Sequence, residues 1–280
     1  MSRYSIFTFQ FSPIEQSESC LPGMRIDVEG NFQKKNELLD LVLSNGFSFM
    51  LKNHSYPHQI VYSENSIVIL QLAHSGYILQ ENDFSRKKLP NSPSCFIIID
   101  NRINKQRVYI EDRTVAFQNT RFTATILEET FNRLLKQYGL SLAMKGEYEA
   151  SEFWRFAKDH SGKIKMLRFS FPYPNLPRVT NQIDQAIIQA GLSVNSKETK
   201  LELNAGKNES LEIKKSNKRL KNLVKASSES GSPIICSTGS KRKHMTIGNA
   251  LRSIDIDMED TLTPTLLESI YQKLQKILTD

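Results

Sequence analysis

The sequence predicts an α+β protein of two lobes, built from mostly antiparallel sheets with packed helices. Short segments rich in β-branched and aromatic residues follow one another closely and are joined by polar turns, which is typical of antiparallel strands. Longer segments carry apolar residues at helical spacing. Prolines cluster between 172 and 177, and they favour a break in the chain. We therefore expect two domains, 1–145 and 146–280.

The first half is expected to combine a sheet with two helices. Helical spacing predicts helices over 32–43 and 123–138, which end at Asn45-Gly46 and at Gly139. Segment 94–100 is continuously apolar rather than alternating, so we expect a central strand that is buried on both faces. A basic, proline-containing loop is expected at 86–90. The expected strands of this half are 4–11, 47–51, 59–62, 66–72, 94–100 and 107–110.

The second half is expected to hold another sheet with its own helices. Alternating apolar and polar residues predict strands over 163–171 and 197–203, and two short apolar runs at 233–236 and 244–247 predict a hairpin. The expected helices begin at Thr180, at Ile213 and near Leu262.

The composition is that of a soluble globular protein. The chain has 280 residues, of which 39% are hydrophobic, enough to bury a proper core. Cys20, Cys95 and Cys236 are widely separated and odd in number, so neither a disulfide framework nor a metal cluster is expected. No apolar run approaches the length of a membrane span. We therefore expect a cytoplasmic protein without a cofactor.

The positive charge is concentrated in one fifth of the chain. The net charge is +7, and residues 197–252 hold 13 Lys and Arg against 5 Asp and Glu, whereas the remaining residues hold 24 against 25. This asymmetry is typical of a surface that binds a polyanion.

Two clusters account for most of this excess. A helix over 213–225 would place four lysines on one side, at i, i+4, i+7 and i+11, with apolar residues on a separate face. A second cluster is expected at the hairpin tip, and we expect the two to converge in one cationic surface. The candidate nucleic-acid-binding residues are Lys214, Lys215, Lys218, Arg219, Lys221, Lys225, Lys241, Arg242 and Lys243.

These clusters predict sequence-independent binding of DNA. Lysine and arginine with few interleaved aromatic residues favour contacts to phosphates over stacking on bases, so we expect a duplex rather than a single strand. Two other interpretations stay open: an exposed charged face without a partner, and a protein-interaction subunit whose basic face binds an acidic partner.

The enzymatic alternative is a metal-dependent nuclease. Glu198 and Lys200 on one strand, together with Asp255 and Asp257, could hold a metal ion and orient a water molecule. The acidic run 255–260 lacks the spacing of a calcium loop, and it could instead cover the basic surface in the absence of DNA. We therefore assign no catalytic or metal-binding residue.

The order of these elements resembles that of the RexA family of phage-exclusion proteins. In both, a helix at 38–43 precedes a strand-rich region, a hydrophobic strand lies at 94–100, and a helix leads into Gly139-Leu140-Ser141-Leu142. Segment 200–203, the basic helix at 214–225, a hairpin around 239–244 and a closing helix follow in the same order.

The resemblance implies a two-domain, DNA-binding homodimer that senses phage replication intermediates. It also implies a second defence-system protein as partner, one that is membrane-bound. The hypothesis from the sequence is thus a DNA-binding sensor of a phage-exclusion system.

Overall fold

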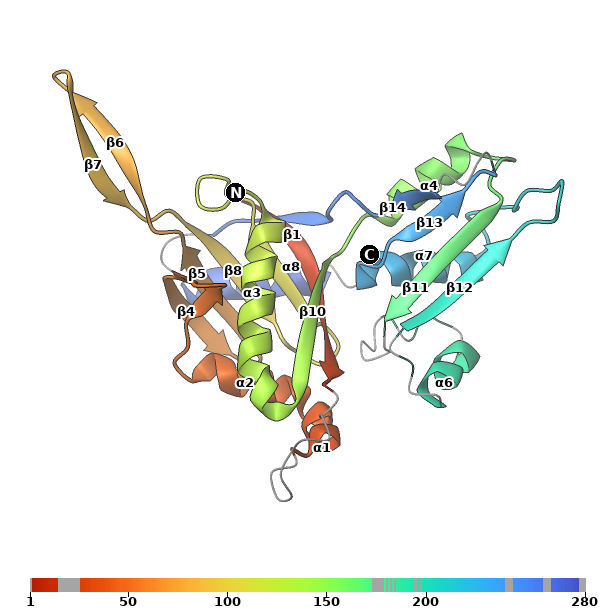
Figure 1. Ribbon diagram of the computed structural model, residues 1–280, viewed down its shortest axis with the longest axis horizontal. Helices are drawn as coiled ribbons and strands as arrows, with labels where there is room; N and C mark the ends of the chain where they lie inside the picture. Colours follow the sequence, from red (N-terminus) through yellow and green to blue (C-terminus); the bar gives the residue numbers. More distant parts are fainter. Residues whose placement is uncertain are drawn as a thin grey trace.

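The computed structural model describes residues 2–14, 26–172, 179, 181, 183, 185–193, 196, 198–239, 244–258 and 263–276. Two antiparallel sheets, each with helices packed on it, form two lobes (Figure 1). The α+β class is confirmed. Among the described residues no helix has the length and apolar character that crossing a membrane requires.

The first lobe is built on a large antiparallel sheet with the strand order β10-β1-β9-β8-β5-β4, and β15 also pairs with β1. The long strand β1 has β9 on one side, while β15 and β10 share its other side, along Ser2–Ser5 and Phe7–Pro13 respectively. The strands are β1 (Ser2–Pro13), β4 (His58–Glu64), β5 (Ile67–Ala73), β8 (Ser94–Asp100), β9 (Arg107–Glu111), β10 (Leu140–Gly146) and β15 (Ser253–Ile256).

Helices cover both faces of this sheet. On one face α2 (Lys35–Ser44) and α3 (Thr120–Leu135) pack on a core that includes Ile97 and Ile99 of β8. On the other face α8 (Pro264–Lys276) packs on Phe96 and Ile98 of the same strand. The prediction that 94–100 is a central strand buried on both faces is confirmed.

Smaller elements complete the first lobe. Helix α1 (Val28–Gln33) precedes α2, and the turn η1 (Lys136–Tyr138) ends at Gly139, which has a left-handed φ of 69° and confirms the predicted end of this helix. At the end of α2, Asn45 is extended, with a φ of −87°, so the left-handed stop expected at Asn45-Gly46 is wrong. Strands β2 (Phe49–Leu51) and β3 (His54–Tyr56) form a separate pair. Strands β6 (Gly76–Asn82) and β7 (Ser85–Asn91) form a projecting hairpin (Figure 1). The expected loop at 86–90 is wrong, because these residues lie in β7.

The second lobe is built on a smaller antiparallel sheet with the order β12-β11-β13-β14. Helices α4 (Ala150–Asp159), α6 (Gln185–Ser193) and α7 (Lys218–Ser230) contribute to its core, together with Leu167, Phe169 and Phe171 of β11. The alternate residues Arg168 and Ser170 are only half-buried, on the opposite face of the sheet. The strands are β11 (Met166–Pro172), β12 (Glu198–Asn204), β13 (Ile234–Ser237) and β14 (His244–Ile247).

The chain crosses between the lobes twice, and the two crossing segments lie side by side. Tyr148 and Leu251 form an antiparallel bridge, and the amide of Arg252 donates to the carbonyl of Glu147 at 2.7 Å. After the second crossing, β15 joins the first sheet and α8 covers it. The expected division at 145/146 assigns β15 and α8 to the second lobe, whereas the structure places these two elements in the first. The segment returns there because Ile256, Ile270 and Leu274 complete an apolar core that β1, β5 and β8 leave open.

Candidate nucleic-acid interface

Helix α7 carries the predicted basic stripe, but it begins later than expected. Its first residue is Lys218, because the side chain of Asn217 accepts a hydrogen bond from the amide of Leu220 at 3.2 Å and caps the helix. Leu211 and Ile213 instead pack on the second core from the segment before the helix. The expected helix over 213–225 is therefore wrong at its start.

This start changes the stripe. Lys214 and Lys215 precede α7 and belong to a turn in which the amide of Asn217 donates to the carbonyl of Lys214. The four-lysine stripe is thus reduced to Lys218, Lys221 and Lys225, which lie at i, i+3 and i+7 of α7. These three lysines lie on one side of the helix, so the predicted spacing is confirmed for this shorter set.

The opposite side of α7 anchors it. Leu220, Val224 and Ala226 are buried in the second core, so the helix cannot turn its cations inward. At its far end the carbonyl of Ser228 accepts from the amide of Tyr148 at 3.2 Å, and Gly231 ends the helix with a φ of 66°. The 13 residues of α7 extend over about 20 Å, and this end of the helix lies at the junction of the lobes.

The cations differ in what lies beside them. Lys214 pairs with Glu212 at 2.5 Å and Lys225 approaches Glu229 at 3.9 Å. Lys218, Arg219 and Lys221 are exposed, and no carboxylate of the described residues lies within 4.0 Å of their charged groups. Lys215, before the helix, is also exposed and has no such neighbour among the described residues, so the unpaired part of the cationic surface consists of Lys215 and these three side chains.

Helix electrostatics strengthen the positive potential of this turn. The amino end of a helix carries a partial positive charge, which acidic residues usually offset. The first turn of α7 contains no acidic residue and holds Lys218, Arg219 and Lys221. The free amide groups and the three cations therefore favour an anion at the same place.

The second predicted cluster, Lys241, Arg242 and Lys243, lies outside the described residues. Its flanks are described: Ser237 of β13 pairs with His244 of β14. Met166, the first residue of β11, pairs with Ser237 and with Asn204, the last residue of β12. Convergence of the two clusters in one surface stays a prediction.

The outward face of the second sheet is charged but internally paired. Arg168 contacts Glu202 at 2.6 Å, and Lys200 contacts Glu198 at 2.9 Å. Hydrogen bonds from Asn204 and Arg168 lower the pKa of the Glu202 carboxyl. Because each of these cations has a carboxylate neighbour, this face offers less net charge to a polyanion than α7 does.

The residues considered for a nuclease are not brought together. Glu198 and Lys200 lie on β12 of the second sheet, whereas Asp255 lies on β15 of the first sheet, opposite Arg3. Asp257 follows β15. In the described part of the chain no group of three or more His, Cys, Asp or Glu side chains is placed to hold a metal ion.

A small cavity of about 160 Å³ lies where α7 meets the junction of the lobes. Lys221 and Lys225 line it together with Tyr148, Trp154 and Arg252. Arg252 also approaches Glu149 at 3.7 Å. The charge and helix patterns of the sequence do not single out Arg252 or Trp154. Their only signal was a cation at the end of the basic segment and an aromatic residue at the start of the second lobe.

Comparison with known proteins finds no matching protein family, no matching curated protein and no matching solved structure. The fold and the site thus define a class in physical terms. The chain is a two-lobed α+β protein whose second lobe presents an anchored cationic helix.

Proposed function

We propose that this protein binds duplex DNA, independently of sequence, through the first turn of α7. The observation that carries the proposal is the exposure of Lys218, Arg219 and Lys221 without a described carboxylate beside them. Elsewhere in the second lobe, Arg168 and Lys200 are paired with acidic residues. A surface left unpaired in this way favours an external polyanion.

Phosphates are the chemical group that this surface fits. Each lysine or arginine that neutralises a phosphate releases a condensed counterion, which drives binding and makes it depend on salt. Hydrogen bonds to phosphates carry no base information. The cationic turn of α7 contains no aromatic residue on which a base could stack, and this favours a duplex over a single strand.

The proposed cellular role rests on the resemblance to RexA proteins. The protein would act as the DNA-binding sensor of a phage-exclusion system in the cytoplasm. It would be a homodimer and would pass its signal to a second, membrane-bound defence protein. The effector activity would belong to that partner.

A salt titration of duplex binding tests the proposal. Removing three phosphate contacts with Lys218→Gln, Arg219→Gln and Lys221→Gln should reduce the slope of log K against log salt by about 2.7, since each contact contributes about 0.9. Gel-shift or fluorescence anisotropy with an unrelated pair of duplex sequences measures both the slope and the lack of specificity.

The matched control removes three exposed lysines of the first lobe, Lys34→Gln, Lys52→Gln and Lys136→Gln. It lowers the net charge equally but should leave the slope nearly unchanged. An equal loss in both variants, or no duplex binding by the unmodified protein, would contradict the proposal. Plasmid nicking in magnesium that disappears in Glu198→Ala would support the nuclease alternative instead.

A further inference from the structure

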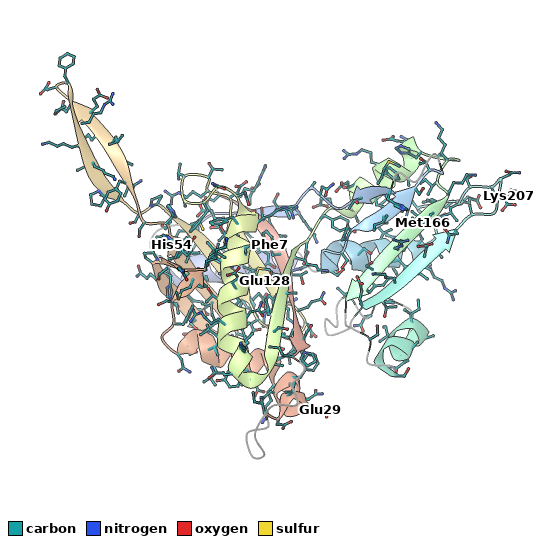
Figure 2. All side chains as sticks on the ribbon, viewed as in Figure 1. Phe7, Glu29, His54, Glu128, Met166 and Lys207 are labelled. Carbon is teal, nitrogen blue, oxygen red and sulfur yellow. The ribbon has the colours of Figure 1, made fainter. Side chains whose placement is uncertain are left out.

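The β6–β7 hairpin stands apart from the rest of the molecule. Among the described residues its strands pair only with each other, as a two-stranded sheet. It projects from the first lobe, on the side away from the second lobe (Figure 1; its side chains are drawn in Figure 2). We call residues 76–91 the arm. A two-stranded hairpin with nothing packed on it is marginally stable in water.

The arm exposes apolar side chains on both of its faces. Tyr77 is 64% exposed and Leu79 is 71% exposed on one face, and the tip residue Phe84 is fully exposed. Ile78 and Leu89 lie opposite each other on the second face, at 48% and 37% exposure. A concentration of exposed apolar surface of this kind marks an interaction site rather than an ordinary monomer surface.

At the tip of the arm, Phe84 has a backbone conformation that is unfavourable for a bulky side chain. Asp83 and Phe84 have φ values of 49° and 60°, the left-handed values of a two-residue hairpin turn that glycine or asparagine prefers. The turn between β4 and β5 has the same conformation but holds Asn65 and Ser66, with φ values of 53° and 59°. The arm keeps a bulky side chain where a small one would be less strained. Strain of this kind is typical of functional positions, so it indicates that Phe84 is a contact residue.

A receiving surface lies on the same lobe. A groove of about 430 Å³ runs between β5 and α8, with apolar walls that include Ile67, Leu267 and Leu274. Its rim carries the exposed carboxylates of Glu64 and Glu268. The volume is in the range of binding pockets, so it can take the phenyl ring of a hairpin tip.

The charges of the arm complement this rim. Strand β7 carries Arg86, Lys87 and Lys88 directly after the tip. Lys88 lies over the ring of Tyr77 at 4.4 Å and Arg86 approaches Glu81 at 3.3 Å. Lys87 has no carboxylate within 4.0 Å among the described residues. An apolar tip followed by cations matches an apolar groove bordered by glutamates.

We propose that the arm docks in the β5–α8 groove of a second copy of this chain. The arm leaves β5 after Ala73, whereas the groove lies at the other end of β5, beside Ile67. Because the arm points away from its own lobe, the groove it fits belongs to another molecule. Both complementary surfaces are on one chain, so a two-fold axis lets each copy insert its arm into the other.

The area is adequate for a specific dimer. Covering Tyr77 and Phe84 alone removes about 300 Å² per arm. Two reciprocal arms and the surfaces that receive them then bury about 1,200 Å², the lower limit of stable specific interfaces. The remaining apolar residues of the arm add to this area.

Sedimentation velocity over a concentration series tests the proposal on the full chain. The unmodified protein should sediment as a dimer of the 32.1 kDa chain. Phe84→Gly should raise the dimer dissociation constant at least about 30-fold, as expected for a central contact residue. This substitution relieves the backbone strain of the tip, so impaired folding would not explain a monomer. Val115→Ser, at a residue of the first lobe that is 69% exposed, is the matched control and should remain dimeric.

A charge exchange identifies the receiving groove. One variant carries Arg86→Glu and Lys87→Glu in the arm, and the other carries Glu64→Lys and Glu268→Lys at the groove. Each should be monomeric alone, because its arm and groove then have the same sign. An equimolar mixture should form a heterodimer, since both contacts become complementary again.

Three results would overturn the proposal: a monomeric unmodified protein at tens of micromolar, a Phe84→Gly protein that stays dimeric, or a charge-exchange mixture that stays monomeric. Arm variants that keep the dimer but weaken duplex binding would assign the arm to nucleic acid instead. The arm proposal rests on the homodimer of the proposed function, but dimerisation is measured without DNA, so its failure is distinguishable from failure of duplex binding.

Discussion

The two sheets of this protein are covered differently, and the difference leaves one face of the second sheet accessible. In β8 of the first sheet, Ile97 and Ile98 lie on opposite faces, and both are fully buried because helices cover each face. In β11 of the second sheet, Phe169 is buried while its neighbour Arg168 reaches the outward face. The first lobe is thus closed on both faces, whereas the second lobe keeps polar side chains and α7 accessible.

One ion pair from the sheet of each lobe shows the same difference. In the first lobe, Arg107 and Glu147 are fully buried and joined by two hydrogen bonds, at 2.7 and 2.9 Å. Burial opposes the charged form of Arg107, but the attraction of Glu147 outweighs it and raises the pKa of the guanidinium. In the second lobe, Arg168 and Glu202 remain about one-third exposed. Geometrically similar pairs should therefore contribute very differently to stability.

The largest expected effect is the loss of the buried pair. Glu147→Ala leaves the Arg107 guanidinium buried without its partner, and we expect the free energy of unfolding to fall by about 3–5 kcal/mol. The exposed counterpart Glu202→Ala should have a much smaller effect, because water solvates the released Arg168. Urea unfolding followed by circular dichroism measures both variants.

A double variant separates the cost of an unpaired charge from the value of the pair. Arg107→Met with Glu147→Leu removes both charges and should restore most of the stability lost in Glu147→Ala. Equal costs for Glu147→Ala and Glu202→Ala would show that the two pairs are solvated alike, contrary to the comparison of the lobes.

The second effect comes from one isoleucine on an inner strand of each sheet. Ile98 of β8 is fully buried beneath α8, and Ile98→Ala should cost about 2–5 kcal/mol through lost burial and a cavity. Ile235 of β13 is only half-buried, on the outward face of the second sheet, and Ile235→Ala should cost about 1 kcal/mol. The same unfolding assay ranks them. A larger cost at Ile235 would indicate that something covers the outward face.

The sequence predicted those parts of the fold that depend on local pattern. The continuous apolar run of β8, the alternation of β11 and the glycine stop at Gly139 each follow from rules of burial and backbone geometry within a few residues. The return of β15 and α8 to the first lobe depends on long-range pairing with β1, which no local pattern encodes.

The errors within the candidate site also have local physical reasons. Leu211 and Ile213 alternate with Glu212, a pattern that indicates an extended segment, and Asn217 is a favoured helix cap. Both signals predict the later start of α7, but the spacing of the lysines suggested an earlier one. The arm was missed because its turn holds Asp83-Phe84 rather than a glycine or asparagine pair.

The smallest expected effect concerns the helix caps, one in each lobe. Asn119 caps α3 by accepting from the amide of Phe122, as Asn217 caps α7 by accepting from Leu220. Either asparagine changed to alanine should lower the free energy of unfolding by about 1 kcal/mol. Thermal unfolding of the two variants measures this. A cost confined to Asn119→Ala would show that the start of α7 does not contribute to folding.

The cap of α7 also connects stability with binding. Asn217→Asp keeps the cap and adds a carboxylate beside Lys218, Arg219 and the positive end of the helix, so stability at low salt should rise by about 0.3–1 kcal/mol. The same carboxylate neutralises part of the surface proposed to hold phosphates, so duplex affinity should fall. Asn217→Ala should lower stability while leaving the salt slope of binding unchanged, because it alters no charge. If DNA contacts this turn, Asn217→Asp should raise the free energy of unfolding and lower the duplex affinity. If DNA does not contact it, the free energy of unfolding should rise and the duplex affinity should stay unchanged.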